Sequence, residues 1–377
     1  LQRQALFAFD QKQREKGDKL WAEVLTARAA AETDYGAATQ TLEHALLLAP
    51  EQPPVRALLS TILGERALLA DKRGQLAHRD ELVRRLRVYD PAGAAYRHLT
   101  GPAALHLGST PPGAEVSLTR YRQDAQGRRS ESDPRALGPT PLSELEIEQG
   151  SYILTLTAPE RVPVRYPLLV GREAVRLHID LPRLGAVPPG MVYVAAGKSL
   201  FGSAAPEPVR RHRADPLHPL TTGPYLIAER ETTFADYLTY LRALPAAERA
   251  RRLPHAGAGP ASLQLGERRD GTYELTVQAG GEVYRAREGE LLHYQGRAQR
   301  AAQDWRRFPV TGLTFADAQA FVQWLAETRR LPGARLCSEQ EWERAARGAD
   351  EREYPHGDTL APADANFGET YEHDPRA

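Results

Sequence analysis

The stretch that decides the fold of the C-terminal half of this chain reads Ala334-Arg-Leu-Cys-Ser-Glu-Gln-Glu-Trp-Glu-Arg-Ala-Ala-Arg-Gly348. It predicts a short helix, because Ser338 is a favoured N-cap residue and Glu341 lies three positions later, where it can reach back to the cap. Trp342 then falls at the centre of the helix. We expect it to pack inward with Ala345 and Ala346 and to anchor a core. The stretch is therefore interpreted as a structural motif without catalytic duty.

Charged residues line the rest of this helix, and we expect its arginines to pair with its glutamates. The residues of the structural motif are Arg335, Glu339, Glu341, Trp342 and Arg347, with Arg344 and Glu343 as further partners. Cys337 precedes the cap and is the one cysteine of the chain. Because it follows Leu336 inside the motif, we expect its thiol to be buried, unpaired and unreactive.

Two further helix starts lie upstream of the motif. Thr314 and Asp317 make a capping-box-like start, and the helix that follows has an apolar face made of Ala318, Phe321, Val322 and Leu325. Residues 225–233 indicate a strand that leads into a second helix, which Thr232 or Thr233 can cap. The buried face of that helix is expected to contain Phe234, Tyr237, Leu238 and Leu241.

These strings together resemble the formylglycine-generating-enzyme (sulfatase-modifying-factor) family. The family pattern Arg-Leu-Pro-Thr-Glu-x-Glu-Trp-Glu-x-Ala-Ala-Arg-Gly is kept here except at Cys337 and Ser338, and residues 191–203 resemble the opening hairpin of the family. The resemblance implies a truncated C-type-lectin-like α+β domain over residues 190–377 whose C-terminal part is missing. Residues 255–304 form an insertion, and the alternation of Tyr273, Leu275 and Val277 predicts a β-hairpin standing off the domain.

The resemblance also implies what chemistry to look for. Copper-dependent members use two cysteines near the C-terminal end, and related iron-dependent enzymes use a set of histidines. Neither set can be assigned: the chain has one thiol, and its eleven histidines show no ligand spacing. We therefore expect no catalytic centre and no cofactor in this chain. Family members also bind calcium near an Ala-Asn segment, which here implies Asn366 with Asp374 as ligands; the alternative is an ordinary Asx-turn.

Residues 103–183 show the period-2 alternation of β-structure. Val175, Leu177 and Ile179 alternate with polar residues, and an alternating run also starts at Tyr152. Turn signals lie at 110–113, 137–141 and 149–150. The polar stretch 122–135 is interpreted as an exposed hairpin loop. The strings Thr110-Pro-Pro-Gly-Ala-Glu-Val116, Leu137-Gly-Pro-Thr-Pro-Leu142 and Gly150-Ser-Tyr152 resemble the PEGA domain, a small β-sandwich that serves as a spacer or surface-binding module.

Residues 1–100 read as helical. Leu20, Trp21, Val24 and Leu25 fall at helical spacing, and the prolines at 53 and 54 restart the chain at a first helical turn. Residues 34–50 loosely resemble the second half of a tetratricopeptide unit. No repeat at a fixed period follows, so we predict a helical hairpin or stalk that packs on itself or on a second copy as a homodimer. The two prolines and two glycines of residues 183–190 mark the boundary before the last domain.

The chain carries 49 basic and 49 acidic residues among its 377. This balance gives no net positive field, so nucleic acid is not an expected partner. No apolar run reaches the length of a membrane span, and there is no signal peptide. The chain starts with Leu1 and is taken as a fragment of a longer protein, whose membrane span would lie in the missing N-terminal part.

Two functional hypotheses follow. The order of helical segment, PEGA-like block and formylglycine-enzyme-like domain resembles the region of myxobacterial-type serine/threonine protein kinases that lies outside the inner membrane. This favours a non-catalytic region, periplasmic or extracytoplasmic, that binds an unknown ligand or cell-envelope component. None of the kinase motifs lies in this chain. The alternative is an oxidative enzyme domain of the same family, with catalytic residues beyond Ala377.

Overall fold

The computed structural model describes residues 1–72, 75–90, 93–205, 214–258, 261–279, 281–295, 297 and 300–365. It is a mixed α+β structure, as expected. Its contacts divide the chain into two compact units, and each is described by itself. Unit 1 contains Leu1–Leu184, Val194–Tyr225 and Gln340–Asp358, whereas unit 2 contains Gly185–Tyr193, Leu226–Glu339 and Thr359–Ala377. The last two segments of unit 1 belong to the expected C-terminal domain, so the unit does not end at the Pro/Gly-rich linker.

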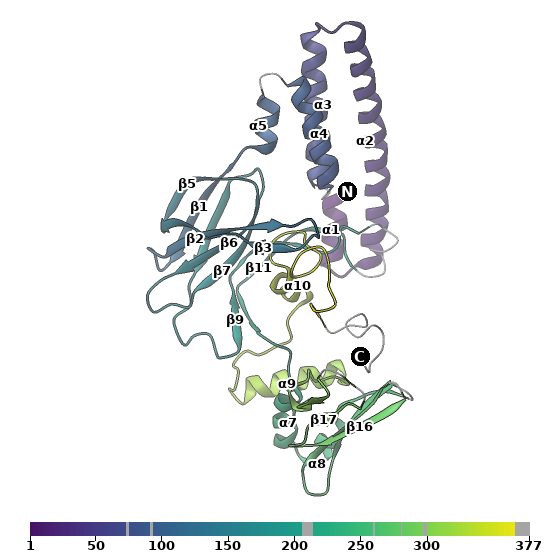
Figure 1. Cartoon of the computed structure of the whole chain (residues 1–377), viewed down its shortest axis with the longest axis vertical. Helices are drawn as coiled ribbons and strands as arrows, with labels where there is room; N and C mark the ends of the chain where they lie inside the picture. Colours follow the sequence, from purple (N-terminus) through teal and green to yellow (C-terminus); the bar gives the residue numbers. More distant parts are fainter. Residues whose placement is uncertain are drawn as a thin grey trace. The chain divides into compact units, whose positions relative to one another are not determined.

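The N-terminal part of unit 1 is helical, and Figure 1 shows α2, α3 and α4 side by side. The helices are α1 (Gln2–Asp10), α2 (Arg14–Leu48), α3 (Pro53–Lys72), α4 (Leu76–Tyr89) and α5 (Ala94–Thr100). Phe9, Trp21 and Val24 form the core between α1 and α2, and Leu59, Leu63, Leu82 and Leu86 form the core between α3 and α4. None of the helices in the described ranges has the length and apolar character to cross a membrane.

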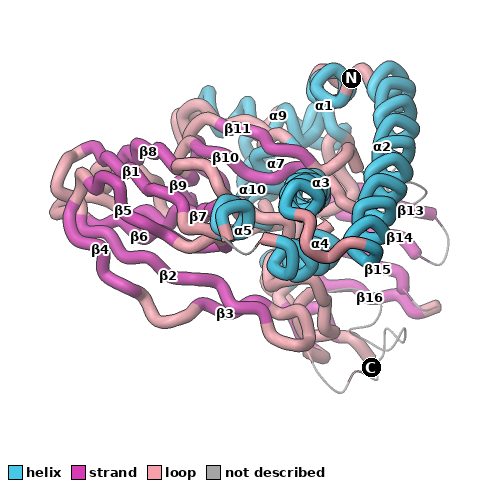
Figure 2. Tube along the Cα trace, turned by 90° about the horizontal axis from the view of Figure 1, so that it is seen from above, coloured by secondary structure: helices cyan, strands magenta, loops and turns pink. Residues whose placement is uncertain are grey.

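Residues 103–180 hold only strands as regular structure, which Figure 2 shows in magenta. They are β1 (Ala103–Thr110), β2 (Glu115–Gln123), β3 (Arg129–Glu131), β4 (Arg135–Pro139), β5 (Leu142–Ile147), β6 (Gly150–Thr157), β7 (Val164–Val170) and β8 (Val175–Asp180). One sheet has the order β5-β1-β8, and the other has the order β3-β2-β6-β7 with β4 paired to β2. The expected alternation is present, because Leu154 and Leu156 of β6 and Ile179 of β8 are buried.

The opening strands of the C-terminal half pair differently from the expected hairpin. The strands are β9 (Met191–Val194), β10 (Gly197–Phe201), β11 (His218–Thr222) and β12 (Tyr225–Ala228). Among the described pairings, β9 pairs with β12, and β10 pairs antiparallel with β11. The two adjacent strands β9 and β10 therefore serve two different sheets. Alternation within each strand does not specify its partner, which is why the sequence misassigned this pairing.

Unit 2 begins its helices at the predicted caps. Thr233 and Thr314 each form a capping box with the aspartate three residues later. The elements are α7 (Phe234–Ala243), α8 (Ala246–Arg251), β13 (His255–Ala258), β14 (Ala261–Glu267), β15 (Tyr273–Ala279), β16 (Glu282–Arg287), β17 (Leu292–His293), β18 (Ala302–Gln303), η1 (Trp305–Arg307) and α9 (Phe315–Glu327). The predicted face of α7 is buried.

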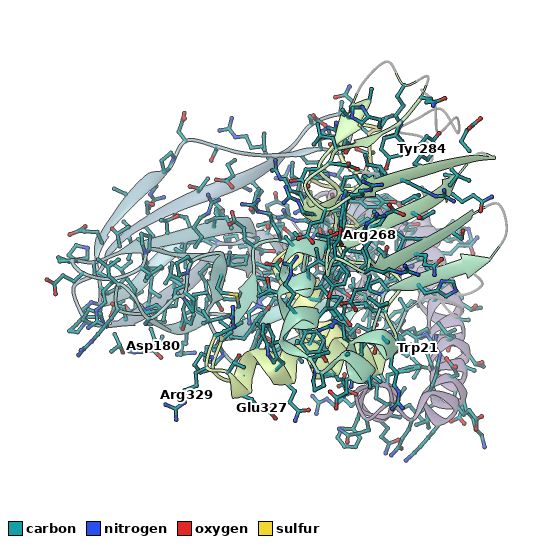
Figure 3. The ribbon with its side chains drawn as sticks, turned by 90° about the horizontal axis from the view of Figure 1, so that it is seen from below. Trp21, Asp180, Arg268, Tyr284, Glu327 and Arg329 are labelled. Atoms are coloured by element: carbon teal, nitrogen blue, oxygen red, sulfur yellow. The ribbon has the colours of Figure 1, made fainter. Side chains whose placement is uncertain are left out.

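The insertion at 255–304 does not stand off the domain, which corrects the sequence prediction. It forms a four-stranded antiparallel sheet, β13-β14-β15-β16, on which Arg268 and Tyr284 are labelled in Figure 3. Leu265, Tyr273 and Leu275 of this sheet share one core with α7 and Trp305. Trp305 is completely buried, and its ring meets that of Phe234 edge to face at 5.7 Å. Apolar residues alternating along a strand are buried on one face, and here that face covers α7.

The signature helix α10 (Glu339–Arg347) forms where it was predicted, but with its faces exchanged. Trp342 is 61% exposed, whereas Arg344 is only 3% exposed. Residues two positions apart on a helix point to opposite sides, so burying Arg344 turns Trp342 outward. The expectation that Trp342 anchors the core is therefore wrong.

The two tryptophans provide a matched test of this assignment. We expect Trp305→Ala to lower the free energy of unfolding by about 3–5 kcal/mol, because it removes a fully buried ring. Trp342→Ala should change the stability by less than about 0.5 kcal/mol, as is usual for exposed positions. Chemical denaturation followed by circular dichroism measures both. A larger loss for Trp342→Ala than for Trp305→Ala would contradict the helix orientation described above.

Candidate functional site

Arg344 anchors helix α10 in unit 1. Its guanidinium donates to the carbonyl oxygens of Gly197 at 3.0 Å and Ala195 at 2.7 Å, and also to the hydroxyl of Thr222. Burial lowers the pKa of Arg344. Among the described residues it has no carboxylate partner within ion-pair distance, so carbonyl dipoles and a hydroxyl hold the buried charge. Gly197 permits this approach, because a Cβ there would lie only 2.7 Å from a terminal nitrogen of Arg344 and would also overlap the hydroxyl of Tyr166.

The expected arginine–glutamate pairing along α10 occurs between Arg347 and Glu343, at 2.5 Å. The same two side chains bracket the backbone of Gly202: its N–H donates to Glu343 at 2.9 Å, and its carbonyl accepts from Arg347 at 2.9 Å. Arg335 donates to the carbonyl of Leu336. Pairing of the Glu339 and Glu341 side chains with arginines stays a prediction. The motif therefore ties α10 to the turn after β10.

The carboxylate of Asp350, two residues beyond the motif, is the centre of a buried ion-pair network. Asp350 is 1% exposed and binds Arg352 through Nε at 2.7 Å and through a terminal nitrogen at 2.8 Å. It also accepts from Arg129 of β3 at 2.5 Å and from the hydroxyl of Ser151 of β6. Three stretches that lie far apart in the sequence meet at this one carboxylate.

The charge partners control the ionisation of Asp350. Burial by itself would raise the pKa of this carboxyl, but the hydrogen bonds from Arg352 and Ser151 and the charges of Arg352 and Arg129 outweigh it. The pKa of Asp350 is therefore held below its usual range. The sequence analysis did not single out Asp350, Arg129 or Ser151. No local pattern marks them, because their partners lie some 200 positions away in the chain.

Backbone contacts reinforce the network. Arg129 N donates to the carbonyl of His356 at 2.7 Å, and Asp358 N donates to the carbonyl of Gly127 at 2.8 Å. Gly357 has a φ of +136°, and a Cβ at this position would overlap the Gly127 carbonyl. The β2–β3 hairpin is therefore held against residues 354–358 by backbone hydrogen bonds. The interpretation of 122–135 as a wholly exposed loop is wrong at this point.

A cleft of about 1400 Å³ lies beside this network within unit 1. Its lining includes residues of helices α1 to α5, of β2, β6 and β7, and of the segments around 203 and 217, and it includes Arg129, Ser151 and Glu351. Charged residues of both signs line it: Arg28, Arg79, Arg120, Arg129 and Arg172, with Asp71, Asp80, Glu146, Glu148 and Glu351. This lining gives polar contacts of both signs next to apolar surface, which suits binding of a polar ligand.

Cys337 is exposed, and the prediction that its thiol is buried is therefore wrong. Residues 334–338, which precede α10, form neither helix nor strand, and Leu336 is partly buried there while the adjacent Cys337 is exposed. The inference of a buried thiol from an apolar neighbour failed for this reason.

The expected calcium ligands, Asn366 and Asp374, lie outside the described residues. Within the ranges that the structure describes, histidine, cysteine, aspartate and glutamate side chains form no cluster of three or more that could hold a metal ion. Of the histidines, His218 is buried against the carbonyl of Pro216 at 2.6 Å and the carboxylate of Asp10 at 3.1 Å.

Comparison with known proteins supports the family resemblance. Residues 182–376 match the model of the sulfatase-modifying factor enzyme 1-like domain. The chain is 28% identical over 180 residues to the formylglycine-generating enzyme of Streptomyces coelicolor, covering 46% of this chain and 52% of that protein. It is 25% identical over 194 residues to the formylglycine-generating enzyme of Thermomonospora curvata, covering 48% and 58%. The chain thus spans about half the length of the curated relatives it matches.

The Asp350 network predicts a specific pH dependence. We expect Asp350→Asn to lower the free energy of unfolding at pH 7 by about 3–5 kcal/mol, because Arg129 and Arg352 lose their buried counter-charge. Because the pKa of Asp350 is lower in the folded state than in the unfolded state, its ionisation stabilises the fold at pH values above the unfolded-state pKa. This stabilisation is lost as the pH falls through the folded-state pKa. The difference between variant and wild type should therefore shrink below about pH 4.

Denaturant titrations at a series of pH values measure this difference. Asp180→Asn, which removes an exposed carboxylate of the same unit (Figure 3), is the matched control and should be near wild type throughout. A difference for Asp350→Asn that stays constant down to the lowest pH would contradict the assignment.

Proposed function

This chain belongs to the sulfatase-modifying factor enzyme 1-like domain family, and from that membership we propose that it is the ligand-binding part of a larger protein. The cleft of unit 1 is the binding site in this proposal. Glu343 and Arg347 of the family signature hold the backbone of Gly202, which adjoins the lining residue Ser203. Arg129 and Glu351 line the cleft, while Asp350 beside them fixes Arg129.

The size and charge of the cleft support this reading and indicate a class of ligand. At about 1400 Å³ it exceeds the roughly 300–1,000 Å³ typical of sites for single small molecules. Its five arginines are matched by five acidic residues, so neither a strongly anionic nor a strongly cationic ligand is favoured. An extended polypeptide segment with both charges and apolar side chains fits these properties.

Arg120 offers a test of the cleft. It is partly exposed in the cleft lining, and its guanidinium reaches Glu148 at 2.6 Å. We expect Arg120→Glu to weaken binding of short fluorescein-labelled peptides with equal numbers of lysines and glutamates by about tenfold or more, a loss of about 1.4 kcal/mol. Fluorescence anisotropy measures the affinity.

Arg165→Glu is the matched control, because Arg165 is also an exposed strand arginine paired with a glutamate, Glu131, but is not part of the cleft lining. Its affinity should stay within about twofold of wild type. If peptides bind equally well to both variants, or if no member of a peptide library binds the wild type, the cleft is not the binding site.

A second candidate, formylglycine formation, is favoured by the names of the two matched relatives. A copper site built from two cysteines does not fit this chain, because its 377 residues contain one thiol, and that thiol is exposed before α10. We therefore derive no catalytic step through that metal for these residues.

This candidate has a direct test. The purified chain, given copper or iron, oxygen and a cysteine-containing peptide, should yield no oxidised peptide by mass spectrometry above the metal-only control. Cys337→Ser should behave in the same way. Peptide oxidation that Cys337→Ser abolishes would overturn the preference for a binding function.

On the resemblance of its block order alone, we propose that this chain forms the periplasmic or extracytoplasmic part of an inner-membrane serine/threonine kinase, and that its ligand is a component of the cell envelope. Protease accessibility of this region in intact spheroplasts tests the location, and digestion only after lysis would contradict it.

A further inference from the structure

Large aliphatic side chains are exposed at one end of the helical segment, where α2 ends, α3 begins and α4 ends. Leu47 and Leu48 of α2 are 79% and 77% exposed, Val88 of α4 is 69% exposed and Leu58 of α3 is 51% exposed. Of the adjacent residues Leu58 and Leu59, only Leu59 belongs to the core between α3 and α4. An exposed apolar surface of this kind typically marks an interaction site.

A hollow lies at the same end. A pocket of about 480 Å³ is lined by Pro50, Pro53, Ala57, Tyr89 and Ala94, among others. The hydroxyl of Ser60 donates to the carbonyl of Tyr89 at 2.7 Å, which holds α3 against the end of α4 there. Leu58 and Val88 each adjoin a lining residue in the chain, and Leu48 precedes Pro50 by two positions. The exposed leucines and the apolar pocket therefore lie at the same end of the helical segment.

Two charges of opposite sign complete this end. Glu51 and Arg56 both belong to the pocket lining and are exposed. Neither side chain forms an ion pair within the described part of the chain, whereas neighbouring charges on the helices do, such as Arg85 with Glu43 at 2.7 Å. One acid and one base thus remain available for a partner.

We propose that this end of the helical segment is a two-fold interface with a second copy of the same chain. Leu47 and Leu48 of each copy enter the hollow of the other, and Glu51 of each copy pairs with Arg56 of the other. In a two-fold interface the same patch must complement itself. Here the protrusion, the hollow and both charges lie on one patch, so a second copy satisfies all of them without any other component.

A membrane surface fits this patch less well. Amphipathic surfaces that bind membranes combine their apolar residues with a rim rich in lysine and arginine. The charged residues of the pocket lining are Glu51, Arg56 and Asp90, and Asp90 accepts a hydrogen bond from the backbone N–H of Tyr96 at 2.9 Å, so the lining has no excess of basic residues. The proposal is independent of the peptide-binding function, since none of these residues lines the large cleft.

Charge exchange at Glu51 and Arg56 tests the interface on the full 377-residue chain. Light scattering coupled to size exclusion should report a dimer for the wild type at concentrations up to about 100 µM. Glu51→Arg and Arg56→Glu should each be monomeric, because two like-charged contacts replace two attractive ones. An equimolar mixture of the two variants should return to the dimer mass, because every contact between them is attractive again.

Lys19→Glu is the control, since it reverses an exposed charge on α2 outside the patch, and it should leave the dimer intact. Leu48→Lys should give a monomer with wild-type circular dichroism. A monomeric wild type, a dimeric Glu51→Arg or Arg56→Glu, or a mixture that stays monomeric would each overturn the proposal.

Discussion

The carboxylate of Asp350 is the constraint on which unit 1 depends. A buried charge must be paired, and this one is paired only if β3 brings Arg129, β6 brings Ser151 and the loop after α10 brings Arg352 to the same point. The β-rich block and the end of the family signature are therefore one structural unit. The Pro/Gly-rich linker separates them along the chain but not in space.

The same requirement explains the orientation of α10. A guanidinium can be buried where several acceptors converge, and the carbonyls of Ala195 and Gly197 with the Thr222 hydroxyl provide them for Arg344. The helix then presents Trp342 to the outside, although hydrophobicity alone favours the reverse. Charged residues of the motif, rather than its tryptophan, connect it to the rest of the unit.

The ion-pair network and the cleft share residues. Arg129 contacts Asp350 and Glu351 and also lines the cleft, and Ser151 of β6 contacts Asp350 and lines the cleft as well. In the proposed binding function, a ligand that binds Arg129 would compete with the contact that this side chain makes to the segment after α10. Ligand binding would then be coupled to the position of that segment through one side chain.

The sequence alone determined the features that arise from neighbouring residues. The capping boxes at Thr233 and Thr314, the buried face of α7 and the strands of 103–180 follow from patterns a few residues long, because caps and amphipathic faces are local. Tertiary structure alone decided the partners of β9 and β10, the packing of the 255–304 sheet onto α7, the exposure of Cys337 and Trp342, and the Asp350 network. These depend on groups distant in sequence, and a local pattern does not record which distant acceptor or apolar face a residue will meet.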